Sequence, residues 1–276
     1  MLEAAARLQT LLRTFEAAMS SSLFVQEGDS SRAAVRLFCF PYAGGNSSIY
    51  RGWQAELGSR IEVVAAELPG RGVLRHDQPY YRLDALVDDF MEQIRPLLDR
   101  PCVFFGHSNG ALMCYALTLA LRRHGCRLPS HLILSAKKPP HLDKEKLHSM
   151  TSEALIERLR ALNGTPPEVL DNPEMMELVL PLLRADFSLS ETFECPDEAP
   201  LSCGATLVGG SADAEASIGE LSQWQRYLPN AGTPIVLQGD HFFVHTRRSD
   251  LLELVRNALK PYFSNQLGRA GSLPSA

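Results

Sequence analysis

The chain has 276 residues, of which 45% are hydrophobic and 21% charged, and its formal net charge is −5. This composition is typical of one large or two small globular domains with a substantial core, and the acidic balance argues against a nucleic-acid-binding protein. The longest apolar run, residues 111–121, is ended by Arg122 and Arg123 and is too short to span a membrane.

None of the six cysteines belongs to a Cys-x-x-Cys pair (Cys39, Cys102, Cys114, Cys126, Cys195 and Cys203). Two of them lie in runs predicted to be buried strands, where a cysteine behaves as a small hydrophobic residue. We therefore expect a reduced, cytoplasmic protein without disulfides, metal or cofactor.

Residues 1–32 are predicted to form an N-terminal helix and linker outside the main domain. Apolar side chains recur at helical spacing from Leu8 to Met19, and a polar stretch follows from residue 20 to residue 32. The helix could rest on the domain or be partly disordered, or it could dock a partner or a second copy. The pattern leaves these alternatives open.

A regular alternation of strands and helices begins at Val35 and supports a single α/β domain over residues 33–262, with a flexible tail over 263–276. The predicted strands are 35–40, 61–68, 101–105, 131–136, 205–208 and 234–238, and the predicted helices between and after them are 47–57, 83–98, 111–121 and 250–260. The strands are continuous apolar runs, which indicates a mainly parallel sheet with helices on both faces. Ser249 is placed to cap the closing helix.

A long insertion, about residues 137–203, separates two of these strands. It contains helical patterns at 152–162 and 173–183, and a third at 185–194. Its apolar residues could simply pack a helical subdomain onto the sheet. We expect instead a lid over the catalytic face, because insertions at the carboxyl ends of parallel strands are where such sheets hold ligands.

The most informative motif is Gly106-His107-Ser108-Asn109-Gly110, which lies between an apolar strand and a helix. This is the Gly-x-Ser-x-Gly spacing of a nucleophile elbow. A serine on so tight a turn has strained backbone angles, and glycine on both sides avoids contacts that a Cβ atom would make. We therefore predict that Ser108 is a nucleophile.

A serine hydroxyl needs a general base, which in such sheets comes last along the chain, after the acid. His241 directly follows the last predicted strand and precedes the last helix, where a base can reach the elbow. His245, four residues further on, is predicted to be structural or on the surface.

The acid that orients the base is predicted to be Asp213, in the glycine-containing loop after strand 205–208. Glu215 is the alternative, and Asp240 is expected to be a loop or cap residue. Asp213 could also merely cap a following helix.

The same strand–loop edge should supply an oxyanion hole. We expect one donor to be the main-chain amide of Asn109, after the nucleophile, and the other to be the amide of Ala43 in the loop 41–45.

Several motifs together resemble type II thioesterases, stand-alone members of the α/β-hydrolase superfamily that accompany polyketide synthases and nonribosomal peptide synthetases. These motifs are Phe40-Pro41-Tyr42-Ala43-Gly44-Gly45, Leu68-Pro69-Gly70-Arg71-Gly72, Gly106-His107-Ser108-Asn109-Gly110, Asn163-Gly164-Thr165-Pro166-Pro167, Leu183-Arg184-Ala185-Asp186-Phe187, Gly209-Gly210-Ser211-Ala212-Asp213 and Gly239-Asp240-His241-Phe242-Phe243. The resemblance covers roughly residues 35–262.

The resemblance implies hydrolysis of acyl groups from the 4′-phosphopantetheine arm of carrier proteins, which clears stalled or misloaded intermediates. It also implies Ser108 as nucleophile, His241 as base and Asp213 as its partner. The expected partner is therefore an acyl-loaded carrier protein, and the protein is expected to be a monomer. A general carboxylesterase or lipase, or a chain-releasing thioesterase, would use the same triad. The chain departs from the family at Asn109, where methionine is usual, and in its N-terminal extension.

Overall fold

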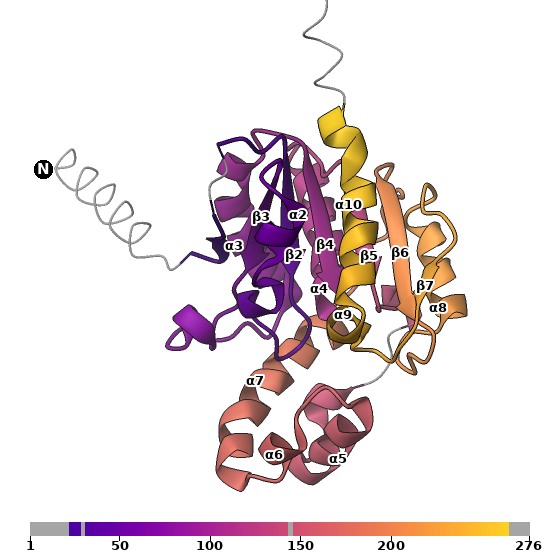
Figure 1. Cartoon of the computed structure of the whole chain (residues 1–276). Coiled ribbons are helices and arrows are strands. Elements are labelled where there is room, and N and C mark those ends of the chain that lie inside the picture. The colour runs from indigo at the N-terminus through magenta and orange to yellow at the C-terminus, as the bar shows by residue number, and fades with distance from the viewer. Residues whose placement is uncertain (1–21, 29–30, 143–145, 265–276) are drawn as a thin grey trace, which may run out of the picture.

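The computed structural model describes residues 22–28, 31–142 and 146–264 (Figure 1). The expected N-terminal helix lies outside these residues, as do residues 265–276 of the expected tail. No helix in the described ranges combines the length and the apolar character that a membrane span requires.

A seven-stranded sheet forms the centre of the protein, with the strand order β1-β3-β2-β4-β5-β6-β7. Its strands are β1 (Phe24–Gln26), β2 (Val35–Phe40), β3 (Ile61–Ala66), β4 (Cys102–His107), β5 (His131–Ser135), β6 (Gly204–Gly210) and β7 (Ile235–Leu237). All neighbouring strands are parallel except β1, the outermost strand on one side, which pairs antiparallel with β3. The parallel arrangement brings the carboxyl ends of β2 to β7 to the same edge of the sheet.

Within the described residues the α-helices are α2 (Trp53–Leu57), α3 (Leu83–Ile94), α4 (Asn109–Arg123), α5 (Ser152–Leu162), α6 (Pro167–Leu170), α7 (Pro173–Glu191), α8 (Ile218–Ser222), α9 (Phe243–Thr246) and α10 (Arg248–Ser264). Short 3-10 helices are η1 (Ser47–Tyr50), η2 (Gly72–Leu74), η3 (Arg95–Leu97), η4 (Pro140–Leu142), η5 (Leu147–Ser149) and η6 (Gln223–Arg226).

Two hydrophobic clusters cover the two faces of the sheet. On one face α3 and α4 pack against alternate strand residues such as Phe38 and Phe104, and on the other face α2 and α10 pack against Leu37 and Phe105. Figure 1 shows α2 and α10 in front of the sheet and α3 behind it. Burial on both faces explains why the central strands are continuous apolar runs.

The lid, defined here as residues 147–191, comprises η5, α5, α6 and α7 and extends beyond the carboxyl edge of the sheet (Figure 1). It has a hydrophobic cluster of its own, which includes Leu155, Leu159, Met176 and Leu180. Most of its apolar residues therefore pack against one another within the lid.

The predicted α/β architecture is confirmed, and each predicted strand is present. One strand was not predicted: β1 lies in the segment interpreted as a polar linker. It has three residues, of which only Phe24 is buried. So short a strand has no periodicity to detect, and its position depends on pairing with β3, far away in the sequence.

Several helix predictions were wrong in detail. The segment 47–57 is divided between η1 and α2, with Gly52 in the left-handed conformation (φ 80°) before α2, and the segment 83–98 is divided between α3 and η3. The helices expected at 173–183 and 185–194 form the single helix α7, which continues through Pro181. The closing helix begins at Arg248, so Ser249 lies inside it and is not its N-cap, and it extends to Ser264.

Candidate active site

Ser108 occupies the turn between β4 and α4, and its backbone is strained. Its φ is 53° and its ψ is −121°, a conformation that residues with a side chain rarely adopt. A Cβ atom on Gly106 would lie 2.1 Å from the carbonyl oxygen of Gly110, and one on Gly110 would lie 2.0 Å from that of Phe40. The two glycines of the motif thus allow strand, turn and helix to pack this closely.

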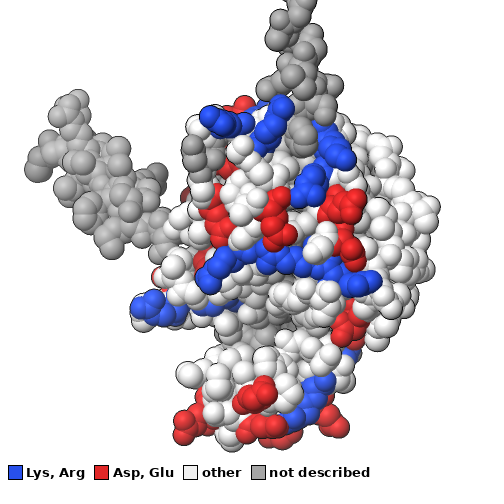
Figure 2. Space-filling view, in the orientation of Figure 1, with Lys and Arg blue, Asp and Glu red and all other residues white. Residues whose placement is uncertain are grey.

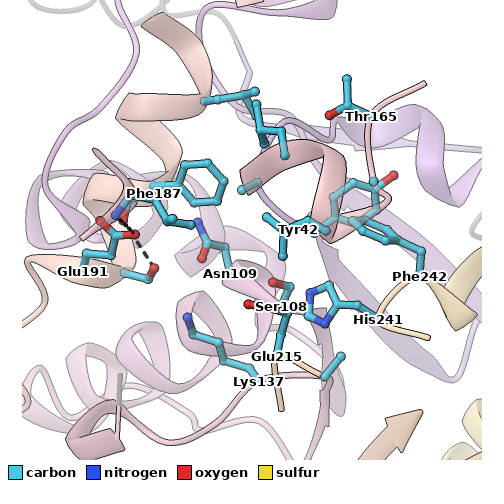
Figure 3. A pocket seen from close by; sticks show the side chains of 18 of the residues that line it. Tyr42, Ser108, Asn109, Lys137, Thr165, Phe187, Glu191, Glu215, His241 and Phe242 are labelled. Atoms are coloured by element: carbon cyan, nitrogen blue, oxygen red, sulfur yellow. Dashed lines mark hydrogen bonds between the residues drawn. The ribbon is translucent and has the colours of Figure 1, made fainter. Parts of the chain in front are cut away.

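The structure brings the three residues of the predicted triad together. His241 Nδ1 lies 3.1 Å and 3.0 Å from the two carboxylate oxygens of Asp213, whose side chain is fully buried. Figure 3 shows the His241 ring beside Ser108. Asp213 Oδ1 also accepts hydrogen bonds from the main-chain amides of Glu215 (2.8 Å) and Ala216 (3.2 Å), which fix the carboxylate.

The alternative residues have other partners. Both carboxylate oxygens of Glu215 accept from Arg158 of α5 at 2.8 Å, so Glu215 joins the lid to the loop that carries Asp213. Asp240 accepts from the main-chain amide of Phe242 at 2.9 Å, which is the loop role expected for it.

His245 contacts the loop 41–45 on the other side of the site. Its Nε2 lies 2.8 Å from the hydroxyl of Tyr42. Burial lowers the pKa of His245 and raises the pKa of Tyr42, so a neutral imidazole faces a protonated phenol. The pair holds Tyr42 next to Ala43, in agreement with a structural role for His245.

His107 contacts the main chain of His241, a role that the sequence motif did not reveal. It is fully buried, and its Nε2 lies 2.8 Å from the main-chain carbonyl of His241. A carbonyl only accepts, so Nε2 carries the proton and Nδ1 accepts from the Ser135 hydroxyl at 2.8 Å. Burial holds the pKa of His107 well below its usual value, which favours this neutral form.

The two candidate oxyanion donors are available for a ligand. Among the hydrogen bonds of the described residues, neither the amide of Ala43 nor that of Asn109 has an acceptor. Asn109 is the first residue of α4, where amides have no partner within the helix and the helix dipole favours negative charge. Both residues line the same cavity as Ser108 and His241.

That cavity has a volume of about 820 Å³, including its open mouth, and it lies between the carboxyl edge of the sheet and the lid (Figure 3). The lid contributes Leu147, Leu159, Leu162, Gly164, Thr165, Leu183, Phe187, Ser190 and Glu191 to its wall. The wall is therefore apolar on much of the lid side, which suits an acyl chain. Within the described ranges, no group of His, Cys, Asp or Glu side chains is arranged to hold a metal ion.

The lid motifs contact the loops of the site. Asn163 donates to the Asp240 carboxylate at 3.2 Å, and a Cβ atom on Gly164 would lie 2.0 Å from the Phe242 ring. The motif 163–167 thus packs directly against the loop that carries His241.

The motif 183–187 is buried against two further loops. Asp186 forms a two-pronged ion pair with Arg71, with nitrogen–oxygen distances of 2.5 Å and 2.7 Å. The side chain of Asn109, whose effect the sequence left open, donates to the main-chain carbonyl of Asp186 at 2.6 Å. No local pattern could reveal these contacts, because 77 and 115 residues separate the partners.

Comparison with known proteins shows the family to which this chain belongs. The family described as "Thioesterase domain" matches residues 35–259. The chain is 37% identical over 245 residues to the linear gramicidin dehydrogenase LgrE of Brevibacillus parabrevis, with 87% of this chain and 93% of that protein covered. The name of this relative describes a different reaction from that of the matching family.

Solved structures give the same family as the sequence match. RedJ, a thioesterase from the prodiginine biosynthetic pathway of Streptomyces coelicolor, superposes with a TM-score of 0.79 at 32% identity, covering 87% of this chain and 95% of RedJ. YbtT, a type II thioesterase from the yersiniabactin NRPS/PKS pathway, also gives a TM-score of 0.79, at 30% identity, covering 88% of this chain and all of YbtT (100%). The chain belongs to the thioesterase family and is a thioester hydrolase with the α/β-hydrolase fold.

Proposed function

We propose that this protein releases acyl groups from the 4′-phosphopantetheine arm of carrier proteins, and that it edits stalled or misloaded intermediates of polyketide or nonribosomal peptide synthesis. The observation that carries the proposal is the Ser108–His241–Asp213 arrangement at the floor of a cavity covered by the lid. Similarity to RedJ and YbtT supports the carrier-bound substrate.

In the first half-reaction, Ser108 Oγ attacks the thioester carbonyl carbon while His241 takes the hydroxyl proton. The amides of Ala43 and Asn109 stabilise the oxyanion of the tetrahedral intermediate. When this intermediate collapses, the carbon–sulfur bond breaks and His241 protonates the pantetheine sulfur. Asp213 fixes the tautomer of His241 and stabilises the imidazolium that forms in between.

In the second half-reaction, a water molecule attacks the acyl-serine ester. His241 takes a proton from the water, the oxyanion forms again at the same two amides, and the Ser108 oxygen leaves with that proton. The products are a carboxylic acid and the free enzyme. His107, which holds the main chain of His241 and stays neutral, keeps the base in place through both steps.

The substrate class is tested by comparing kcat/KM for an acyl-pantetheine thioester with kcat/KM for an aryl oxygen ester of the same acyl group. We expect the thioester to be strongly preferred, and a carrier-bound thioester to be better still. A strong preference for the oxygen ester would instead indicate a general carboxylesterase.

A further inference from the structure

Asp186 of lid helix α7 is one of the few buried charged residues at the carboxyl edge of the sheet, and 2% of its surface is exposed. Its carboxylate faces out of the lid toward the loop that follows β2. Besides its two bonds with Arg71, it accepts from the main-chain amide of Gly44 at 2.6 Å. Gly44 directly follows Ala43, one of the two proposed oxyanion donors.

The main chain of the same residue reaches the other donor. The carbonyl oxygen of Asp186 accepts from Asn109 Nδ2 at 2.6 Å, and the main-chain amide of Asn109 is the second proposed donor. A single lid residue therefore contacts both segments that form the oxyanion hole, one through its carboxylate and the other through its carbonyl group.

The loop after β2 has little freedom around this contact. Gly44 has a φ of +81°, and a Cβ atom there would lie 2.8 Å from Leu183 Cδ2 of α7. Arg71 also donates to the carbonyl oxygen of Gly45 at 3.1 Å, so the ion pair holds the loop on either side of Gly44. Hydrogen bonds to charged groups are the stronger kind, and here they are shielded from water.

We propose that Asp186 is a positioning residue for the oxyanion hole, and that Ala43 and Asn109 are aligned as donors when α7 is docked against both of their segments. This inference rests on the proposed function, since it assumes that the oxyanion of a thioester forms at those amides. It assigns the lid a role beyond covering the acyl chain: a docked lid completes the hole.

The amides of an oxyanion hole contribute most once the oxyanion has formed. A donor of this kind is valuable only when it lies about 2.7–3.1 Å from the developing oxyanion, and losing one costs about 10²–10³ in kcat. A displaced loop should therefore affect the tetrahedral intermediate much more than the bound substrate. Substitution of a residue that only stabilises the fold would not affect the tetrahedral intermediate more than the bound substrate.

The test is the substitution Asp186→Asn, which keeps the shape but removes the charge. We expect kcat for an acyl-pantetheine thioester to fall about 10–100-fold, with KM changed by less than about threefold. Two ligands distinguish binding of the tetrahedral intermediate from binding of the substrate. An alkyl boronic acid forms a tetrahedral adduct in which Ser108 Oγ bonds to boron and its proton passes to His241, whereas an S-alkyl pantetheine thioether mimics only the ground state.

Boronate affinity should fall in parallel with kcat, and thioether affinity should be unchanged. The matched control is Glu62→Gln, which neutralises an equally buried carboxylate paired with Arg36 at the far edge of the sheet. This control should lower stability but keep kcat and boronate affinity within about twofold of the wild-type values. The proposal is wrong if Asp186→Asn retains wild-type kcat, or if it weakens both ligands equally.

If Asp186→Asn does not fold, Asn109→Ala tests the second contact. It keeps the main-chain amide and removes only the side chain that binds the Asp186 carbonyl, so we expect boronate affinity to fall about tenfold. Unchanged boronate affinity would overturn the proposal. Failure of the proposed function would look different, because the wild-type protein itself would then not hydrolyse the thioester.

Discussion

The two edges of the parallel sheet each contain a buried arginine–carboxylate pair, and the two pairs have different consequences. At the amino edge, Arg36 of β2 and Glu62 of β3 lie directly opposite each other on neighbouring strands and are joined by a 2.8 Å ion pair. At the carboxyl edge, Arg71 and Asp186 join a loop to the lid across 115 residues of sequence.

The comparison shows that the same chemistry can stabilise a fold or build a site. The pair at the amino edge connects strands that backbone hydrogen bonds already hold together. The pair at the carboxyl edge has no such ladder beneath it, so it determines where a loop and a helix lie. Figure 2 shows charged side chains exposed on one face of the molecule. The two buried pairs differ from such solvated charges, whose contribution to stability is small.

The largest loss of activity is expected at the acid of the triad. Asp213→Asn should lower kcat by about 10³–10⁴, because the amide would favour the wrong tautomer of His241. The neighbouring Glu215→Gln loses only its charge toward Arg158 and should change kcat by less than about threefold. Steady-state kinetics on both variants decide between the two carboxylates, and an equal loss in both would contradict the assignment of Asp213.

A smaller effect is expected where the lid meets the loop of His241. Gly164→Ala would place a methyl group 2.0 Å from the Phe242 ring, so either the ring or the lid must shift. We expect kcat/KM for acyl-pantetheine to fall about tenfold with the melting temperature changed by only a few degrees. Gly219→Ala, in α8, meets no atom within 4 Å and is the matched control.

The smallest expected effect is on the pH dependence of stability, to which His107 at the carboxyl edge and His131 near the amino edge should contribute differently. Since the pKa of buried His107 is lowered in the folded state, its contribution to stability is complete above the unfolded-state pKa of about 6.5 and is lost as the pH falls below it. Each such histidine adds at most about 1.4 kcal/mol per pH unit to the slope. Burial lowers the pKa of His131, near the amino edge, but that residue is only partly buried.

Urea unfolding between pH 7 and pH 5 tests this difference. We expect His107→Gln to flatten the pH dependence of the unfolding free energy more than His131→Gln does. Equal slopes in the wild type and the His107 variant would show that folding does not shift the pKa of His107, which would contradict the prediction.

Features that depend on residues close together in the sequence could be predicted, whereas features that depend on distant contacts could not. The elbow at 106–110 and the strand runs depend on neighbouring residues, and they were predicted where they lie. Asp213 and His241 were found because chain order and strand ends restrict where an acid and a base can sit. The hydrogen bond between them agrees with that choice, and their catalytic roles remain a prediction.

The contacts that were missed are long-range. Strand β1 depends on pairing with β3, and the role of the Asn109 side chain depends on a carbonyl group of α7. In the sequence His107 stands out only as part of the elbow motif, yet it holds the main chain of a residue 134 positions later. None of these partners has a local pattern, so only the folded chain reveals them.

The most direct test of the account is intact-mass spectrometry of an acyl-loaded carrier protein incubated with the wild type and with Ser108→Ala. We predict that the wild type returns the carrier to its unacylated phosphopantetheine mass, and that Ser108→Ala, folded normally, leaves the acyl group in place. Loss of the acyl group with Ser108→Ala, or an intact thioester after incubation with a wild-type protein that cleaves aryl esters, would contradict it.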